Sequence, residues 1–140
     1  MRILILNGPN LNMLGKRQPE IYGTRSFTDY YNELQEQFTG LDYFQSNHEG
    51  DLIDRLHEVS GHYNGVVFNP GGFAHTSVAL ADAIRSIEIP VVEVHLTNIY
   101  ARENYRQHSF TAEASRGVVS GFGLEGYRMA VQYLFNINTV

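Results

Sequence analysis

The fold of this 140-residue chain is decided by one stretch near its middle, Gly65-Val66-Val67-Phe68-Asn69-Pro70-Gly71-Gly72. Its first five residues form a short apolar run that predicts a buried strand, and the Pro-Gly-Gly sequence ends that strand. A helix is expected directly afterwards, from about Thr76 to Ser86. A buried strand that leads through a loop into a helix is the unit from which α/β proteins are built.

The same alternation continues on both sides of this stretch. Ser26 is a typical N-cap and predicts a helix that runs to about Phe38. Short strands separated by helices of ten or more residues indicate a parallel sheet with helices on both faces. The sequence therefore predicts a single α/β domain, residues 1–140, with five strands in the flavodoxin-like architecture. The other strands are expected at residues 2–6, 41–46, 90–95 and 117–120, and the other helices from Gly50 onward and over residues 124–135.

The composition disfavours several kinds of chemistry. The chain has no cysteine, which excludes disulfides, thiolate catalysis and zinc–thiolate sites. Its formal net charge of -5 argues against nucleic-acid binding, which needs a basic surface. The only lysine, Lys16, belongs to an expected exposed loop, where its amine is not desolvated for imine chemistry. The first apolar run, residues 3–6, is too short for a signal peptide or a membrane span, so we expect a cytoplasmic protein.

Ligands of open parallel sheets bind beyond the carboxyl ends of the strands, so the loops after the strands are the candidate binding regions. The long loop at residues 7–23 is typical either of a lid or of a tolerated surface insertion. In the loop at residues 69–77, glycines allow backbone N–H groups to approach a ligand, and the following helix N-terminus favours oxyanions. His75 in that loop fits a binding role or a simple role at the helix start.

The strand at residues 90–95 carries a second candidate, the pair Glu93 and His95. Residues two apart on a strand point to the same side, so the two side chains are expected to meet. A buried carboxylate beside a histidine would fix its tautomer and favour its protonated form, as a general acid requires. An accidental pair at a strand end is the alternative.

A glycine motif near the C-terminus resembles a dinucleotide site. The segment Gly121-Phe122-Gly123-Leu124-Glu125-Gly126 matches G-x-G-x-x-G after a strand and before a helix. Such a site also needs a following strand with an acidic residue about 20 positions on, and only one predicted helix remains. We interpret these glycines as a tight turn and predict no NAD cofactor.

Taken together, these loops resemble the type II 3-dehydroquinate dehydratases over essentially the whole chain. The resemblance implies a flavodoxin-like fold, no cofactor and no metal, and a dodecamer built from trimers. It also implies dehydration of 3-dehydroquinate to 3-dehydroshikimate, a step of the shikimate pathway. Two departures are Gln18, where many members carry an acidic residue, and Leu96-Thr97 in place of a commoner Ile-Ser pair. The matching segments are residues 7–12, Arg17 with Tyr22-Gly23, residues 69–72 with His75-Thr76-Ser77, Glu93-Val94-His95, and Ser120-Gly121-Phe122-Gly123.

The resemblance also assigns the catalytic roles. Tyr22 is implied as the general base, in its tyrosinate form, on the carbon beside the ketone. Because free tyrosine titrates near 10, a cation must stabilise that form, and Arg17 is the family's candidate. Asn10 is implied to hold a water against the developing oxyanion. His95, oriented by Glu93, would protonate the departing hydroxyl.

The substrate-binding set also comes from the resemblance. Arg106 could pair with the substrate carboxylate through two hydrogen bonds, although an arginine on a solvated face is the alternative. Asp82, seven residues after His75 on one face of the same predicted helix, is implied to serve the neighbouring subunit's site. A solvated helix aspartate is the alternative for Asp82. The implied substrate-binding residues are Asn69, His75, Asp82, the Leu96 backbone, Thr97 and Arg106.

A competing hypothesis is a non-catalytic flavodoxin-like module that binds flavin or a signalling partner. Clustered acidic residues after the first strand would favour a signalling receiver, and a hydroxyl-rich loop there would favour flavin. The loop instead carries Asn10, Lys16 and Arg17, and Gly8-Pro9-Asn10 contains no hydroxyl. A visible absorption spectrum distinguishes the two classes, because bound flavin is yellow.

Overall fold

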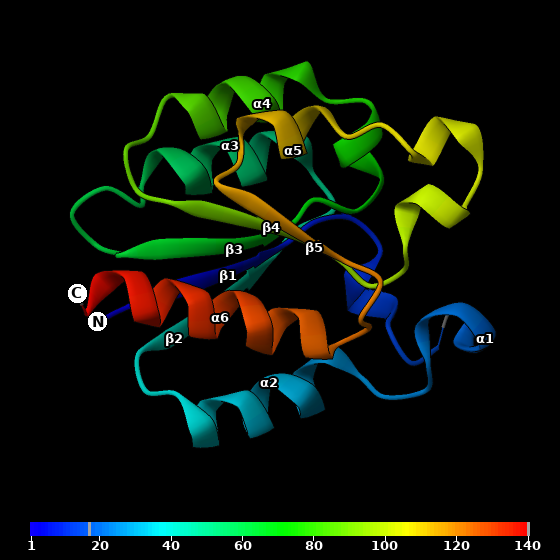
Figure 1. The fold of residues 1–140 in the computed structure, drawn as a ribbon, viewed down its shortest axis with the longest axis horizontal. Coiled ribbons are helices and arrows are strands. Elements are labelled where there is room, and N and C mark those ends of the chain that lie inside the picture. Colours follow the sequence, from blue (N-terminus) through cyan, green and yellow to red (C-terminus); the bar gives the residue numbers. More distant parts are fainter. Residues whose placement is uncertain (17, 140) are drawn as a thin grey trace.

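The computed structural model describes residues 1–16 and 18–139, and these form a parallel five-stranded sheet between two layers of helices (Figure 1). The strand order is β2-β1-β3-β4-β5, the order of flavodoxin-like proteins. The predicted fold class is therefore confirmed. The strands are β1 (Ile3–Asn7), β2 (Leu41–Gln45), β3 (Gly65–Asn69), β4 (Val91–His95) and β5 (Gly117–Ser120).

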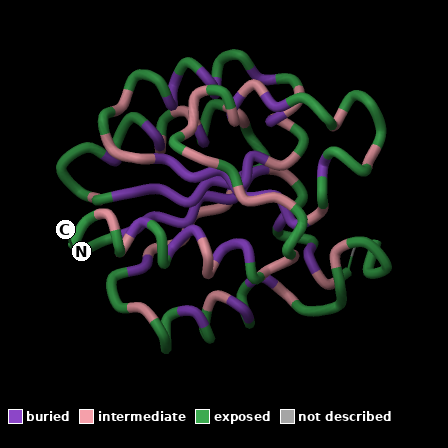
Figure 2. Tube along the Cα trace, viewed as in Figure 1, coloured by how far each residue is buried: buried purple, intermediate pink, exposed green. Residues whose placement is uncertain are grey.

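Alternate residues of each central strand face opposite helical layers. In β1, Ile3 and Ile5 pack toward α2 (Phe27–Gln37) and α6 (Glu125–Asn138), whereas Leu4 and Leu6 pack toward α3 (Glu49–His57) and α4 (Val78–Arg85). The central strands are accordingly buried along their whole length (Figure 2). This burial on both faces explains why the strands are continuous apolar runs in the sequence.

The helix starts follow from their serine caps. Ser26 accepts a hydrogen bond from the Asp29 N–H, so α2 begins where the sequence predicted. Ser77 caps α4 through the Leu80 N–H, so this helix begins at Val78 rather than at Thr76. His75 therefore ends a separate 3-10 turn, η2 (Gly71–His75), and the prediction that His75 and Asp82 share one helix is wrong.

Two regions contain helices that the sequence did not predict. The loop after β1 includes η1 (Leu11–Met13) and the four-residue α1 (Pro19–Tyr22). The chain between β4 and β5 forms η3 (Ile99–Ala101), η4 (Asn104–Arg106) and α5 (Phe110–Ala114), and α5 packs beside α4. These segments are short, so they carry no helical periodicity that a sequence pattern could reveal. Among residues 1–16 and 18–139, we find no helix with the length and apolar character needed to span a membrane.

Candidate active site

A cleft lies beyond the carboxyl ends of β1, β3 and β4. It contains about 770 Å³ of empty space, including space open to solvent, which is within the range of small-molecule sites. Its position agrees with the general rule for open parallel sheets. The lining includes eight residues that the sequence analysis singled out: Asn10, Tyr22, Asn69, His75, His95, Leu96, Thr97 and Arg106.

The floor of the cleft is made by two loops whose backbones nearly touch. A Cβ atom on Gly8 would lie 2.5 Å from the Pro70 carbonyl oxygen, and one on Gly71 would lie 2.9 Å from the Pro9 carbonyl oxygen. Only glycine permits this approach, and Gly71 also has a positive φ of 60°. Gly8 and Gly71 are therefore required by the close packing of these two loops.

A buried tyrosine from the last helix joins the ends of β1 and β3. The Tyr127 hydroxyl donates to Asn7 Oδ1 at 2.8 Å and accepts from Asn69 Nδ2 at 2.9 Å. Asn69 Oδ1 accepts from the Gly71 N–H at 3.1 Å, so the network extends to the cleft floor. Burial raises the pKa of Tyr127 far above its usual value, which keeps the hydroxyl protonated and able to donate. The sequence pattern did not reveal this contact between distant segments.

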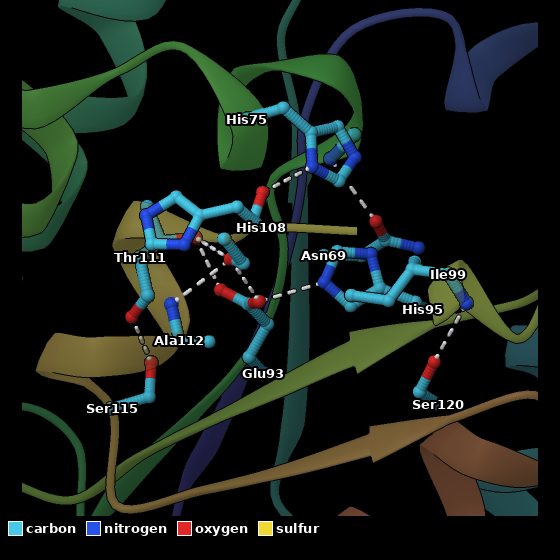
Figure 3. A network of polar contacts seen from close by, with 12 residues as sticks. Asn69, His75, Glu93, His95, Ile99, His108, Thr111, Ala112, Ser115 and Ser120 are labelled. Carbon is cyan, nitrogen blue, oxygen red and sulfur yellow. Dashed lines mark hydrogen bonds and ion pairs between the residues drawn. The ribbon is translucent and has the colours of Figure 1, made fainter. Parts of the chain in front are cut away.

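His95 is held from behind by a buried carboxylate (Figure 3). Its Nε2 lies 2.6 Å from Glu93 Oε2, and Glu93 is fully buried with an exposure of 0%. The carboxylate also accepts from the hydroxyls of Ser109, at 2.7 Å, and Thr111. The two side chains on β4 therefore meet as their spacing predicted, with Glu93 behind His95 rather than in the cleft lining.

His75 lies beside His95, with ring centroids 6.0 Å apart. Its Nδ1 is 2.8 Å from the His108 carbonyl oxygen, which can only accept, so Nδ1 carries the proton (Figure 3). Burial lowers the pKa of His75 below its usual value and outweighs the opposing effect of this hydrogen bond. His75 is therefore neutral at pH 7 and has an acceptor lone pair on Nε2.

Tyr22 ends α1 and lines the same cleft. The Arg102 Nη1 atom donates to the Tyr22 hydroxyl at 2.9 Å, and the guanidinium carbon lies 5.8 Å from the centre of the tyrosine ring. Arg102 also lies 3.5 Å from Thr97 Oγ1. The sequence analysis did not assign Arg102 a role. Its place in the loop after β4, where ligands of this architecture bind, was the available signal.

The other predicted residues have distinct positions. Asn10 has a left-handed backbone, with φ of 71°, a conformation that asparagine tolerates better than most residues. Arg106 Nε lies 3.1 Å from a Glu103 carboxylate oxygen. Asp82 is on the exposed side of α4, 3.5 Å from Arg85, and does not line the cleft. Arg17 lies outside the described residues.

Two further observations concern chemistry at this site. Within residues 1–16 and 18–139, no group of three or more His, Asp or Glu side chains is arranged to hold a metal ion. Lys16 is exposed and is not among the residues that line the cleft.

The glycine segment after β5 forms a turn in which the Gly121 and Gly123 N–H groups donate to the carbonyls of His95 and Leu96.

Comparison with known proteins gives consistent relationships. A curated 3-dehydroquinate dehydratase of Bacillus licheniformis is 54% identical over 140 residues, covering 97% of each chain. The crystal structure of a type II dehydroquinase from Butyrivibrio crossotus matches with a TM-score of 0.91 and 40% identity, over 96% of this chain and 97% of that one. One from Propionibacterium acnes matches with a TM-score of 0.90 and 37% identity, over 95% and 94%. The model of the family "Dehydroquinase class II" matches residues 1–135, and the chain therefore belongs to the class II dehydroquinases.

Proposed function

We propose that this chain dehydrates 3-dehydroquinate to 3-dehydroshikimate through an enolate, with Tyr22 as base and His95 as acid. The observation that carries the proposal is the pairing of a tyrosine bound by a guanidinium with a histidine bound by a buried carboxylate, both lining one cleft. The curated relative at 54% identity bears the name of this activity. The reaction belongs to the shikimate pathway, which leads to the aromatic amino acids.

A positively charged side chain, Arg102, lies next to the proposed base, Tyr22. Arg102 donates to the Tyr22 hydroxyl oxygen, and a guanidinium at this position stabilises negative charge on that oxygen. Arg17 is implied by the family resemblance as a further cation. The tyrosinate takes the proton from the carbon beside the ketone, and the electron pair moves onto the carbonyl oxygen. Asn10, at the edge of the cleft, is expected to hold a water against that oxyanion.

The acid completes the elimination. An ionised Glu93 can only accept, so Nε2 of His95 carries a proton and Nδ1 remains for the reacting group. Protonated His95 gives its proton to the departing hydroxyl, which leaves as water while the enolate collapses to the conjugated enone. The carboxylate holds the ring in the orientation that this step requires.

The remaining lining residues suit a small polyhydroxy acid. Neutral His75 can accept from a substrate hydroxyl at Nε2. Arg106 is proposed to bind the substrate carboxylate through its Nη groups, since its Nε faces Glu103. Asn69, Thr97 and the Leu96 backbone supply further polar contacts in the cleft.

The deciding experiment is a direct assay with 3-dehydroquinate. We expect ultraviolet absorbance of a conjugated enone to appear when purified protein is added. A colourless protein with this activity supports the proposal. A yellow protein without turnover would favour the flavin-binding module instead. Borohydride treatment with substrate should leave the protein mass unchanged, whereas a mass increase on Lys16 would contradict the imine-free mechanism.

We also propose that the chain assembles as a dodecamer of trimers, in which Asp82 serves the neighbouring subunit's site. Asp82 lies outside the cleft of its own chain and has a side-chain exposure of 70%, which fits a contact with another subunit. The test mixes Tyr22→Phe and Asp82→Ala proteins after subunit exchange. Recovered activity supports a shared site, and no recovery despite proven exchange and a real Asp82→Ala defect contradicts it. A cytoplasmic location stays a prediction.

A further inference from the structure

The chain at residues 108–111 binds one cleft histidine, His75, directly and the other, His95, through Glu93. The His108 carbonyl accepts from His75, while Ser109 and Thr111 donate to the carboxylate that holds His95 (Figure 3). Ser109 is 7% exposed and Thr111 is 0% exposed, so neither hydroxyl is a surface feature. A short segment between η4 and α5 thus fixes the surroundings of both rings.

We propose that Ser109 and Thr111 are positioning residues for the acid step, and that they act through Glu93. Their hydroxyls hold the carboxylate in the one orientation in which His95 presents Nδ1 to the cleft. This inference rests on the proposed function only for its effect on turnover. The orientation itself is a property of the protein without substrate.

The first reason is geometric. Glu93 Oε1 accepts from Thr111, and Oε2 accepts from Ser109 and from His95. Donors on both oxygens fix the rotation of the carboxylate plane. The direction of the acceptor lone pair on Oε2 then fixes the tautomer and the ring orientation of His95.

The second reason concerns charge. A buried carboxylate persists in its ionised form only when donors compensate for its lost hydration. The two hydroxyls supply that compensation and share the negative charge with His95. Among the residues that the structure describes, the other charged or titratable side chains that line this cleft are His75, Tyr22, Arg102 and Arg106.

The third reason is that the two hydroxyls are held in place by the helix. Ser109 Oγ accepts from the Ala112 N–H as the N-cap of α5 while its own proton goes to Glu93. Thr111 lies in the first turn of α5, and the helix packs beside α4. The start of α5 and the binding of Glu93 therefore depend on the same side chains.

The test compares Thr111→Val with Thr111→Ser. Valine keeps the branched shape but cannot donate, whereas serine keeps the hydroxyl. Ser115→Ala is the matched control, because the Ser115 hydroxyl donates to the Thr111 carbonyl on the same helix and not to Glu93. We expect Thr111→Val to lower kcat on the order of tenfold, a fraction of the ~10²–10⁴-fold that general acid–base catalysis supplies, with little change in KM.

The pH profile supplies a readout that loss of packing would not give. Without the Thr111 donor, the buried carboxylate of Glu93 loses part of its compensation, and its interaction with His95 changes. The kcat profile of Thr111→Val should therefore differ from that of the wild type. Thr111→Ser and Ser115→Ala should retain the wild-type profile.

Nitrogen-15 NMR of the histidine rings tests the inference without turnover, with the His95 signal assigned from its absence in His95→Asn. In the wild type we expect Nε2 of His95 to keep its proton, because it faces Glu93, and we expect an Nδ1–H tautomer to appear in Thr111→Val. If the wild type fails to turn over 3-dehydroquinate, the proposed function fails, yet this spectrum still tests the positioning role. Unchanged kcat, profile and spectrum in folded Thr111→Val would overturn the inference, as would equal damage by Thr111→Ser.

A second variant covers the case in which Thr111→Val does not fold. Ser109→Ala removes the other hydroxyl donor, and it also removes a helix cap. Ser26→Ala, which removes the cap of α2 at a residue that does not line the cleft, controls for cap loss. A pH-profile shift in Ser109→Ala but not in Ser26→Ala supports the positioning role, and a wild-type profile in both contradicts it.

Discussion

The two proposed catalytic groups of the cleft, His95 and Tyr22, are held in different ways. His95 is on a central strand, is 6% exposed, and is held by a carboxylate that accepts from three side chains. Tyr22 ends a four-residue helix that contains no buried residue, and Arg102 reaches it from the loop after β4. His95, the proposed acid, is thus positioned by the core of the fold, whereas Tyr22, the proposed base, receives a hydrogen bond from a separate loop.

This difference predicts which mutations lower turnover without lowering the free energy of unfolding. A group supported by the buried core cannot be altered without disturbing packed polar partners, because their unmet hydrogen bonds are costly. A group on a short helix without buried residues, such as Tyr22 on α1, can be altered with little effect on folding. The predictions below test that contrast, beginning with the largest expected effect.

The test with the largest expected effect removes the hydroxyl of Tyr22, the proposed base. Tyr22→Phe keeps the ring but cannot accept a proton, so we expect turnover to fall on the order of 10²–10⁴-fold or more. The free energy of unfolding should change little, because α1 contains no buried residue. Steady-state assays and denaturant titrations measure the two quantities. Activity near that of the wild type would remove Tyr22 from the mechanism.

The next test removes the hydrogen bond from Arg102 to the Tyr22 hydroxyl. Arg102→Ala should lower kcat on the order of 10²-fold, because a donor to developing negative charge is lost. Arg17→Ala should act in the same direction. Arg116→Ala, at an exposed position, is the control. Unchanged turnover in both Arg102→Ala and Arg17→Ala would contradict the proposed role of these cations.

A third test addresses the core-supported side of the contrast. Tyr127→Phe removes the hydroxyl partner of Asn7 Oδ1 and of Asn69 Nδ2 and should cost about 1–3 kcal/mol of unfolding free energy. KM should rise, because Asn69 lines the cleft. Tyr133→Phe removes a hydroxyl from a partly exposed ring on the same helix and should change neither quantity. Equal stability of the two variants would contradict the role of this network.

The smallest expected effect is the contribution of His75 to the pH dependence of the unfolding free energy. Burial lowers the pKa of His75 in the folded chain, so the unfolded chain binds more protons as the pH falls below about 6.5. The unfolding free energy attributable to His75 is therefore retained above that pH and lost progressively below it. We expect the stability of the wild type to fall more than that of His75→Gln between about pH 8 and pH 5. His62→Gln, at an exposed histidine, should match the wild type throughout.

The site illustrates which features a sequence pattern can reveal. The pair Glu93 and His95 was predictable because strand geometry places alternate residues on one side. The start of α2 was predictable because the Ser26 cap is a local hydrogen bond. Arg102, Ser109 and Thr111 were not identified, because their roles depend on how the chain after β4 returns to the sheet. The helix after His75 was predicted to begin at about Thr76, but α4 begins two residues later, at Val78. His75 therefore lies outside that helix.

The sequence by itself determined the five strands, their helical layers and the edge of the sheet where the cleft lies. These features follow from hydrophobic periodicity and from the geometry of parallel sheets, which act over short stretches of chain. Only the tertiary structure decided which groups meet in the cleft: Tyr127 with Asn7 and Asn69, Arg102 with Tyr22, and α5 with Glu93. Such contacts join residues up to 120 positions apart, and local periodicity carries no information about them.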